Sequence, residues 1–371
     1  MDSPSSPDWA GRLDRVRAAL GARQLGALVI SNGTNISYLT GFAGSAGLLL
    51  ITPDEARLIV DGRYELAARQ GIEAGRVAAV TIGRVEGRYD QALGQTVTWL
   101  APRRVGFEAA HVTVATLGAW QRAASVPEWV PTEHVVERLR EVKDAQEISV
   151  LRRGGGLISD VAGQLGGFVR SGRTEREVAD LIDRAIRAVG FSAPAFDTIV
   201  ASGPNSARPH ARPGDRPLTR GDLVVLDFGG VLDGYCLDLT RMAAVGPISP
   251  DAQALFDAVS AAHQAAVESV RPTVETWRVD RAARAVLEAR GLGDAFLHST
   301  GHGLGLEVHE APRVGRADPE APSVLEAGMV FTIEPGAYLE HVGGVRVEDD
   351  VLVTETGAEL LTTAPRELIA V

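Results

Sequence analysis

The chain has 371 residues, 45% hydrophobic and 23% charged, and its 48 acidic and 37 basic side chains give a formal net charge of −11. An acidic chain needs a local basic patch to bind nucleic acid or an anionic membrane, and the sequence offers only short pairs such as Arg103-Arg104. Both classes of partner are therefore excluded. One cysteine, Cys236, also excludes an internal disulfide framework and a zinc site made of several cysteines.

Neither a membrane span nor a secretory signal is visible in the sequence. No stretch approaches the roughly 18 continuous apolar residues of a span, and residues 1–7 lack the basic and apolar regions of a signal peptide. We therefore expect a cytoplasmic protein. A chain of this length is usually too long to fold around one hydrophobic core, so two domains are expected.

The first domain is expected over residues 1–135, where short apolar runs alternate with amphipathic stretches. This pattern is typical of an α/β domain with a largely buried sheet. The expected strands are residues 27–30, 47–51 and 57–60, and the expected helices are residues 9–22, 64–70, 89–100 and 114–124.

The second domain is expected over residues 140–371. Asp144 and Glu147 fit a capping box and predict a helix start, and further helices are expected over 175–189, 249–270 and 279–290, between strand-rich segments typical of an α+β domain. The run Gly154-Gly155-Gly156 would lie inside the first of these helices, where each glycine costs about 1 kcal/mol relative to alanine. A kink, a close packing contact and a break are all compatible with this run.

Residues 222–238 hold the first group of candidate site residues. An apolar run followed by Asp233-Gly234 predicts a two-residue hairpin. Its register would put Asp227 and Asp238 on one face as diagonal neighbours about 7 Å apart. Gly229, opposite Asp238, would leave room between them. The alternative is that Asp227 simply ends a strand and Asp238 is solvated.

Histidines make up the second group, because His298, His302 and His309 fall within twelve residues. Glycines around them would allow a ligand to approach the backbone closely. A single histidine in such a stretch would more often be a satisfied core residue, but three together favour a site.

The third group consists of Glu334, Arg346 and Glu348. Glu334 ends one apolar strand and Glu348 interrupts another, and a Pro/Gly-rich turn between them would bring the two carboxylates side by side. Arg346 would share the face of Glu348. The alternative is an ion-paired hairpin edge without further function.

Taken together, four carboxylates in apolar strands would carry a large desolvation cost that one arginine cannot offset. Two divalent cations would offset it. Oxygen ligands with one imidazole suit Mn²⁺, while Zn²⁺, Co²⁺ and Fe²⁺ remain compatible. Such a pair of ions activates water and polarises a carbonyl, which is hydrolytic chemistry.

These segments resemble the pita-bread metallopeptidases, in the branch that contains aminopeptidase P and prolidase. The resemblance rests on GY-x-x-D-x-TR at 234–241, HG-x-G-x-x-VHE at 302–310, TIEPG at 332–336 and GVR-x-ED at 344–349, with His210 upstream. Residues 35–42 and 61–64 resemble the family's smaller N-terminal, creatinase-like domain. The resemblance implies a C-terminal pita-bread catalytic domain behind that smaller α/β domain.

The resemblance also implies roles for individual residues. Glu334 would relay a proton in addition to binding metal, His210 and His309 would stabilise the oxyanion, His298 would help to bind substrate, and Arg346 would bind substrate or hold Glu334 or Glu348 in place. The implied ligands of the two metal ions are Asp227, Asp238, His302, Glu334 and Glu348.

The implied reaction is release of an N-terminal residue from a peptide whose second residue is proline. We favour an aminopeptidase P that acts on longer peptides, with a prolidase that acts on dipeptides as the alternative. A methionine aminopeptidase would not need the first domain, a creatinase-like enzyme would lack the ligands, and a non-catalytic binding protein would be expected to have lost some of these residues. The family also implies a homodimer.

Overall fold

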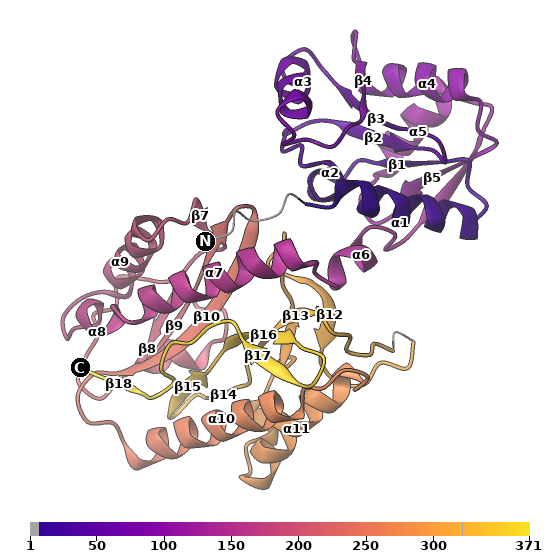
Figure 1. The fold of residues 1–371 in the computed structure, drawn as a ribbon. Helices are drawn as coiled ribbons and strands as arrows, with labels where there is room; N and C mark the ends of the chain where they lie inside the picture. The colour runs from indigo at the N-terminus through magenta and orange to yellow at the C-terminus, as the bar shows by residue number, and fades with distance from the viewer. Residues whose placement is uncertain (1–6, 321) are drawn as a thin grey trace. The chain divides into compact units, whose positions relative to one another are not determined.

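The computed structural model describes residues 7–320 and 322–371, and this part of the chain divides between Arg140 and Glu141 into two compact units (Figure 1). The first unit contains a six-stranded mixed sheet in the order β4-β3-β2-β1-β5-β6. Its strands are β1 (Ala27–Ile30), β2 (Leu48–Ile51), β3 (Ala56–Val60), β4 (Thr81–Arg84), β5 (Arg104–Glu108) and β6 (Glu128–Thr132).

Helices of the first unit follow the expected α/β pattern, with two additions, a helix at 33–40 and a short one at 137–141. The helix α2 was not expected, and it begins after Asn32, whose side chain accepts a hydrogen bond from the backbone N–H of Thr34. The helices are α1 (Trp9–Ala22), α2 (Gly33–Thr40), α3 (Glu65–Glu73), α4 (Tyr89–Leu100), α5 (Val114–Ala123) and α6 (Glu137–Glu141), the last of which ends at the boundary between the units.

Two five-stranded sheets and a separate hairpin form the centre of the second unit. One sheet has the order β18-β10-β9-β7, with β8 also paired to β9, and the other has the order β12-β11-β13-β16-β17. The strands are β7 (Ala193–Pro194), β8 (Ile199–Ser202), β9 (Leu223–Leu232), β10 (Tyr235–Ala244), β11 (Gly301–Gly303), β12 (Glu310–Val314), β13 (Val330–Ile333), β14 (Gly336–Leu339), β15 (Gly343–Arg346), β16 (Asp349–Val353), β17 (Ala358–Leu360) and β18 (Ile369–Ala370).

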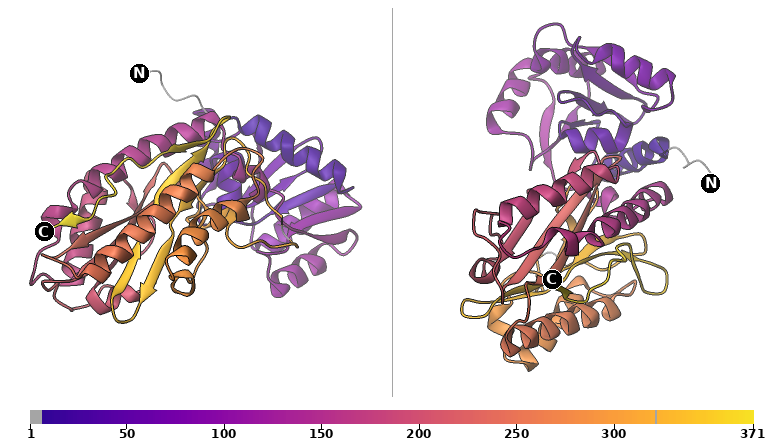
Figure 2. Two further views of the ribbon diagram at one scale, coloured as in Figure 1. Left: turned by 90° about the horizontal axis from the view of Figure 1, so that it is seen from below. Right: turned by 90° about the vertical axis from the view of Figure 1, so that its left-hand side faces the viewer.

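The helices of the second unit lie in two layers, with α7 and α9 on one side of the sheets and α10 and α11 on the other (Figure 2). Each layer packs an apolar face onto the strands, which gives the unit two hydrophobic clusters. No helix in the described residues is long and apolar enough to span a bilayer. The helices are α7 (Ala145–Ala162), α8 (Leu165–Phe168), α9 (Glu175–Ala188), α10 (Pro250–Ser269) and α11 (Thr276–Ala289), with short 3₁₀ turns η1 (Gly203–Ala207) and η2 (Gly293–Ala295).

The run of three glycines lies inside α7, which starts with the predicted capping box of Asp144 and Glu147 and continues through the run without a break. A Cβ atom on Gly154 would lie 2.4 Å from Cδ2 of Leu237, and one on Gly155 would lie 2.1 Å from the carbonyl oxygen of Leu361. A Cβ atom on Gly156 would meet nothing within 4 Å. Of the three possibilities, close packing is therefore the correct one.

Strands β9 and β10 form the predicted two-residue hairpin. Tyr235 pairs with Leu232, so Asp238 lies opposite Gly229 and Thr240 lies opposite Asp227. The expected register is confirmed, and the first two acidic residues share one face of the hairpin.

Candidate active site and metal centre

A cavity of about 560 Å³ in the second unit gathers the predicted site residues. They come from both sheets, from the β14–β15 hairpin and from the segment that follows η1. The cavity is lined by all nine predicted site residues: Asp227, Asp238, His210, His298, His302, His309, Glu334, Arg346 and Glu348.

The four carboxylates reach this cavity from neighbouring strands. Asp227 and Asp238 come from β9 and β10. Glu334 follows β13 and Glu348 precedes β16, and the pairing of these two strands at Ile333 and Asp349 brings the two glutamates alongside each other, as expected.

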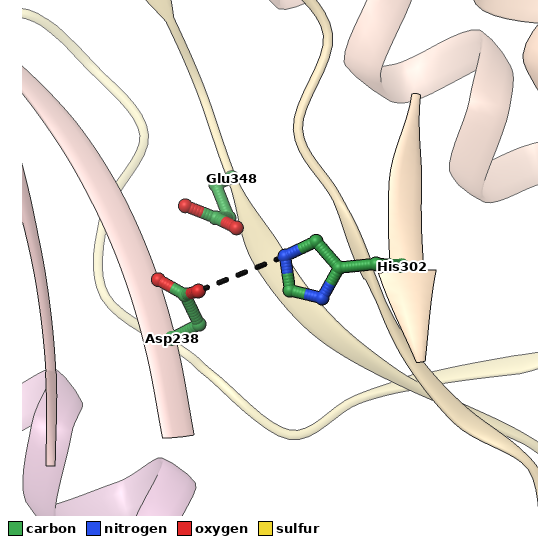
Figure 3. Close-up of side chains that lie close together, drawn as sticks. All are labelled: Asp238, His302 and Glu348. Atoms are coloured by element: carbon green, nitrogen blue, oxygen red, sulfur yellow. Dashed lines mark ion pairs between the residues drawn. The ribbon is translucent and has the colours of Figure 1, made fainter. Parts of the chain in front are cut away.

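Asp238, His302 and Glu348 form a group in which one possible ligand atom of each residue lies within 4.8 Å of those of the other two (Figure 3). Nε2 of His302 lies 3.9 Å from Oδ2 of Asp238 and 3.6 Å from Oε1 of Glu334. Nδ1 of His302 lies 3.1 Å from the carbonyl oxygen of Gly303. Since a carbonyl only accepts, this contact puts the proton on Nδ1 and leaves the lone pair of Nε2 toward the carboxylates.

Burial and mutual repulsion shift the pKa values of these groups. Burial, and then the charge of Glu348, raise the pKa values of Asp238 and Glu334 well above those of ordinary carboxyl groups. Burial and the charge of Asp227 raise the pKa of Glu348 to about 8. Burial lowers the pKa of His302 to about 4, so that its ring is neutral at pH 7 and able to act as a ligand.

The donor set fits divalent metal ions. Oδ1 of Asp238 is buried and, within the described residues, has no hydrogen-bond partner, which is costly for a carboxylate oxygen. The carboxyl pKa values are raised first by burial and then by neighbouring carboxylates, as fits a buried site with excess negative charge. A cation bound between these oxygens would remove both penalties.

Arg346 supplies part of the balancing charge, but its direct partner differs from the two expected ones. Its Nη2 atom donates to Oδ2 of Asp227, and its Nε atom donates to Oγ1 of Thr240 at 3.3 Å. Thr240 in turn donates to Oε2 of Glu348 at 2.6 Å. The direct carboxylate partner of Arg346 is therefore Asp227, and Arg346 reaches Glu348, one of the two expected partners, only through Thr240.

His298 lies in the cavity wall with both ring nitrogens engaged. Nδ1 lies 2.8 Å from the carbonyl oxygen of Ser299, and Nε2 lies 2.9 Å from the hydroxyl of Tyr338. Arg346 donates to that same hydroxyl at 2.8 Å. His298 therefore orients Tyr338 and Arg346, and its nitrogens are not available for the expected polar contact with substrate.

His210 and His309 are the most exposed of the predicted histidines. The ring of His309 lies 4.2 Å, centroid to centroid, from the ring of His302. His210 follows η1 on a segment without regular secondary structure. Both line the cavity, where they can donate to a bound ligand.

The residue that follows His309, Glu310, takes part in a buried ion pair. Nζ of Lys143 lies 3.6 Å from Oε2 of Glu310, and the two side chains are 1% and 6% exposed. Oε1 of Glu310 accepts from the backbone N–H of Glu307 at 2.8 Å. Glu310 thus connects the turn before His309 to Lys143, which precedes the N-cap residue of α7.

Two glycines of the motifs have a different use from the one expected. A Cβ atom on Gly301 would lie 1.8 Å from the carbonyl oxygen of Thr332, and one on Gly229 would lie 2.7 Å from the ring of Phe196. Both glycines therefore allow parts of the protein to pack closely. Gly229 does not leave free space between Asp227 and Asp238.

Other residues of the cavity were not identified from the sequence. Arg313 pairs with His302 across β11 and β12, and its Nε atom donates to Ser299 at 3.0 Å. No carboxylate among the described residues forms an ion pair with Arg313. In the sequence, only the position of Arg313 shortly after the histidine cluster indicated that it could belong to the site. The same cavity is also lined by Phe196 and Arg212.

Comparisons with known proteins identify the families of the two units. The pattern of the metallopeptidase family M24 matches residues 149–355, and that of the creatinase/prolidase N-terminal domain matches residues 12–142. An Xaa-Pro dipeptidase of Pyrococcus furiosus is 33% identical over 360 residues, which cover 96% of this chain and 99% of that protein.

Similar solved structures include an Xaa-Pro dipeptidase from Bacillus anthracis, with a TM-score of 0.93, 33% identity and coverage of 98% of this chain and 100% of that chain. An X-Pro aminopeptidase from Thermotoga maritima has a TM-score of 0.87, 33% identity and coverage of 96% and 100%. The expected pita-bread domain behind a creatinase-like domain is confirmed. The chain therefore belongs to the metallopeptidase family M24, in the branch of the prolidases and aminopeptidases P.

Proposed function

We propose that this metallo-exopeptidase is an Xaa-Pro dipeptidase, which hydrolyses the bond between an N-terminal residue and a C-terminal proline. The observation that carries this choice is Arg313, a guanidinium without a carboxylate partner in the described residues, which lines the same cavity as the carboxylate and histidine cluster. A dipeptide has its free carboxylate one residue beyond the scissile bond, and a guanidinium binds carboxylates in a bidentate manner. Relatives named Xaa-Pro dipeptidases support the same choice.

An aminopeptidase P, which we favoured from the sequence, stays as the second candidate. The X-Pro aminopeptidase of Thermotoga maritima covers this chain almost completely and supports this candidate. In both enzymes the second residue of the substrate is proline, whose tertiary amide has no N–H to donate.

Asp227, Asp238, His302, Glu334 and Glu348 would hold two divalent metal ions, and we propose Mn²⁺ because four of the five ligands are carboxylates. When bound, such ions polarise the scissile carbonyl and activate water at neutral pH. Zn²⁺, Co²⁺ and Fe²⁺ are the other ions to compare.

The remaining chemistry belongs to side chains of the cavity. Glu334, whose side chain is 18% exposed, would hold the proton that leaves the attacking water and pass it to the departing proline nitrogen. His210 and His309 would donate to the carbonyl oxygen as it becomes negative. Ser299 would keep Arg313 turned toward the substrate carboxylate.

The test uses metal-depleted protein reconstituted with each of the four ions. Xaa-Pro dipeptides and Xaa-Pro-Yaa tripeptides are assayed in parallel. Preference for the dipeptide supports the dipeptidase, and preference for the tripeptide supports the aminopeptidase. Absence of cleavage of both peptides with every ion would overturn the proposal.

We further propose that the protein acts as a homodimer in the cytoplasm, on the basis of its resemblance to the family. Light scattering after size exclusion tests the assembly, and cell fractionation tests the location.

A further inference from the structure

Glu175 is a completely buried carboxylate that none of the roles above uses. It is the first residue of α9 and has an exposed fraction of 0%. A buried carboxylate persists only where several donors satisfy it. The identity of its donors therefore indicates what this residue does.

Donors to Glu175 come from both ends of one segment. Oε1 accepts from the backbone N–H and the hydroxyl of Ser202, both at 2.8 Å, and from Nδ2 of Asn205 at 3.0 Å. Oε2 accepts from Nδ2 of Asn205 at 3.2 Å and from the backbone N–H of Gly214 at 3.2 Å. One carboxylate thus closes the loop between residues 202 and 214.

The enclosed segment carries His210. Beyond the turns of η1, this part of the chain has no regular secondary structure, and the carbonyl of Pro209 accepts only a long contact of 3.4 Å from Arg346. Inside the loop, the hydroxyl of Ser206 accepts from the backbone N–H of Gly344 at 2.9 Å and anchors η1 to β15. From Ser206 to Gly214, the position of the backbone that carries His210 therefore depends on this anchor and on how firmly the ends of the loop are held.

The hydrogen-bond pattern requires a carboxylate at position 175. The hydroxyl of Ser202 already accepts from Nη1 of Arg216 at 2.6 Å, so its own proton is directed to Glu175. Every neighbour that contacts the two oxygens is thus a donor. A carboxylate has only acceptors, whereas the amide of a glutamine would turn an NH₂ group toward at least one of these donors.

We propose that Glu175 is a positioning residue that holds the loop of residues 202–214 so that His210 faces the substrate carbonyl. The inference rests on the proposed function for the role of His210. Glu175 itself does not touch the reacting atoms.

The main variant is Glu175→Gln, which keeps the size of the side chain. Because a small displacement of a catalytic group has a large kinetic effect, kcat should fall by roughly tenfold or more while KM changes by less than about threefold. The His210→Ala background separates positioning from general damage. There, Glu175→Gln should have almost no further effect on kcat, and an undiminished effect would overturn the proposal.

Hydrogen exchange provides a readout that does not depend on activity. Amides of residues 203–213 should exchange faster in Glu175→Gln, while those of β9 and β10 stay unchanged. Unchanged exchange in the loop would overturn the proposal. If the wild type cleaves no Xaa-Pro peptide, the proposed function fails, and the exchange experiment still decides whether Glu175 holds the loop.

Two further variants complete the design. Asp180→Asn changes an exposed carboxylate on the same helix and should alter neither kcat nor exchange of the loop. Asn205→Ala removes one donor and leaves the carboxylate in place, so it gives a smaller effect of the same kind if Glu175→Gln does not fold.

Discussion

Arg346 and Asp227 form a buried ion pair across β15 and β9, with Nη2 of the arginine donating to Oδ2 of the aspartate. The same guanidinium contacts Thr240 and Tyr338. It therefore orients one proposed metal ligand directly and a second, Glu348, through the hydroxyl of Thr240.

Replacing Arg346 by lysine should weaken metal binding more than folding. Lysine keeps the charge, but it cannot contact Asp227, Thr240 and Tyr338 at once. Loss of such an outer contact typically lowers metal affinity by about 10 to 100-fold, and this is the expected result in a Mn²⁺ titration. Arg278→Lys, in an exposed pair with Glu275, is the matched control. Equal metal affinity in Arg346→Lys and the wild type would contradict the assigned role.

Without metal, the protein should lose stability as the pH rises from 6.5 to 8. The pKa of Glu348 is raised from 4.5 to about 8, so the folded state binds more protons than the unfolded state across this range. His298 and His302, with pKa values lowered from 6.5 to about 4, act in the opposite sense, but only below pH 6.5. Calorimetry with and without Mn²⁺ checks the prediction. A flat melting temperature for the metal-free protein would refute it.

Replacing Arg313 by methionine should reduce cleavage of the dipeptide more than that of the tripeptide. Methionine has a comparable length but cannot bind the carboxylate that follows proline in the dipeptide. We expect a rise in KM of roughly tenfold or more for the dipeptide, as for the loss of a charged hydrogen bond. Arg316→Met, at an exposed position on the same segment, should be silent. Equal losses for both peptides would argue against the carboxylate contact.

The three glycines of α7 should respond differently to alanine. Gly156→Ala should stabilise the protein by up to about 1 kcal/mol, because the position is open and alanine favours the helix. Gly155→Ala should destabilise it by roughly 1–3 kcal/mol, because the new Cβ atom would overlap a backbone oxygen. Urea denaturation of both variants measures the difference. Two changes of the same sign would show that packing does not decide the effect.

Local signals account for the parts of the structure that were predicted correctly. Asp233-Gly234 determines a hairpin register by itself, which placed Asp227 and Asp238 on one face. Asp144 and Glu147 form a capping box within four residues, so the start of α7 was also readable.

Contacts between distant segments account for most of what was missed. Gly154 and Gly155 pack on Leu237 and Leu361, which no local pattern connects to α7. The partner of Arg346 depends on how β15 lies over β9, and the hydroxyl that engages His298 comes from β14. The helix α2 was missed for a different reason, since eight residues that begin with glycine show little helical periodicity.

Lys143 is the only lysine among the 37 basic residues of the chain, and its side chain is 1% exposed. Reagents and enzymes that modify lysine side chains therefore have a single target, which the folded state protects. Acylation of Lys143 in the native state would require a local opening around Glu310. Its rate would report the free energy of that opening at one defined position, without an engineered probe.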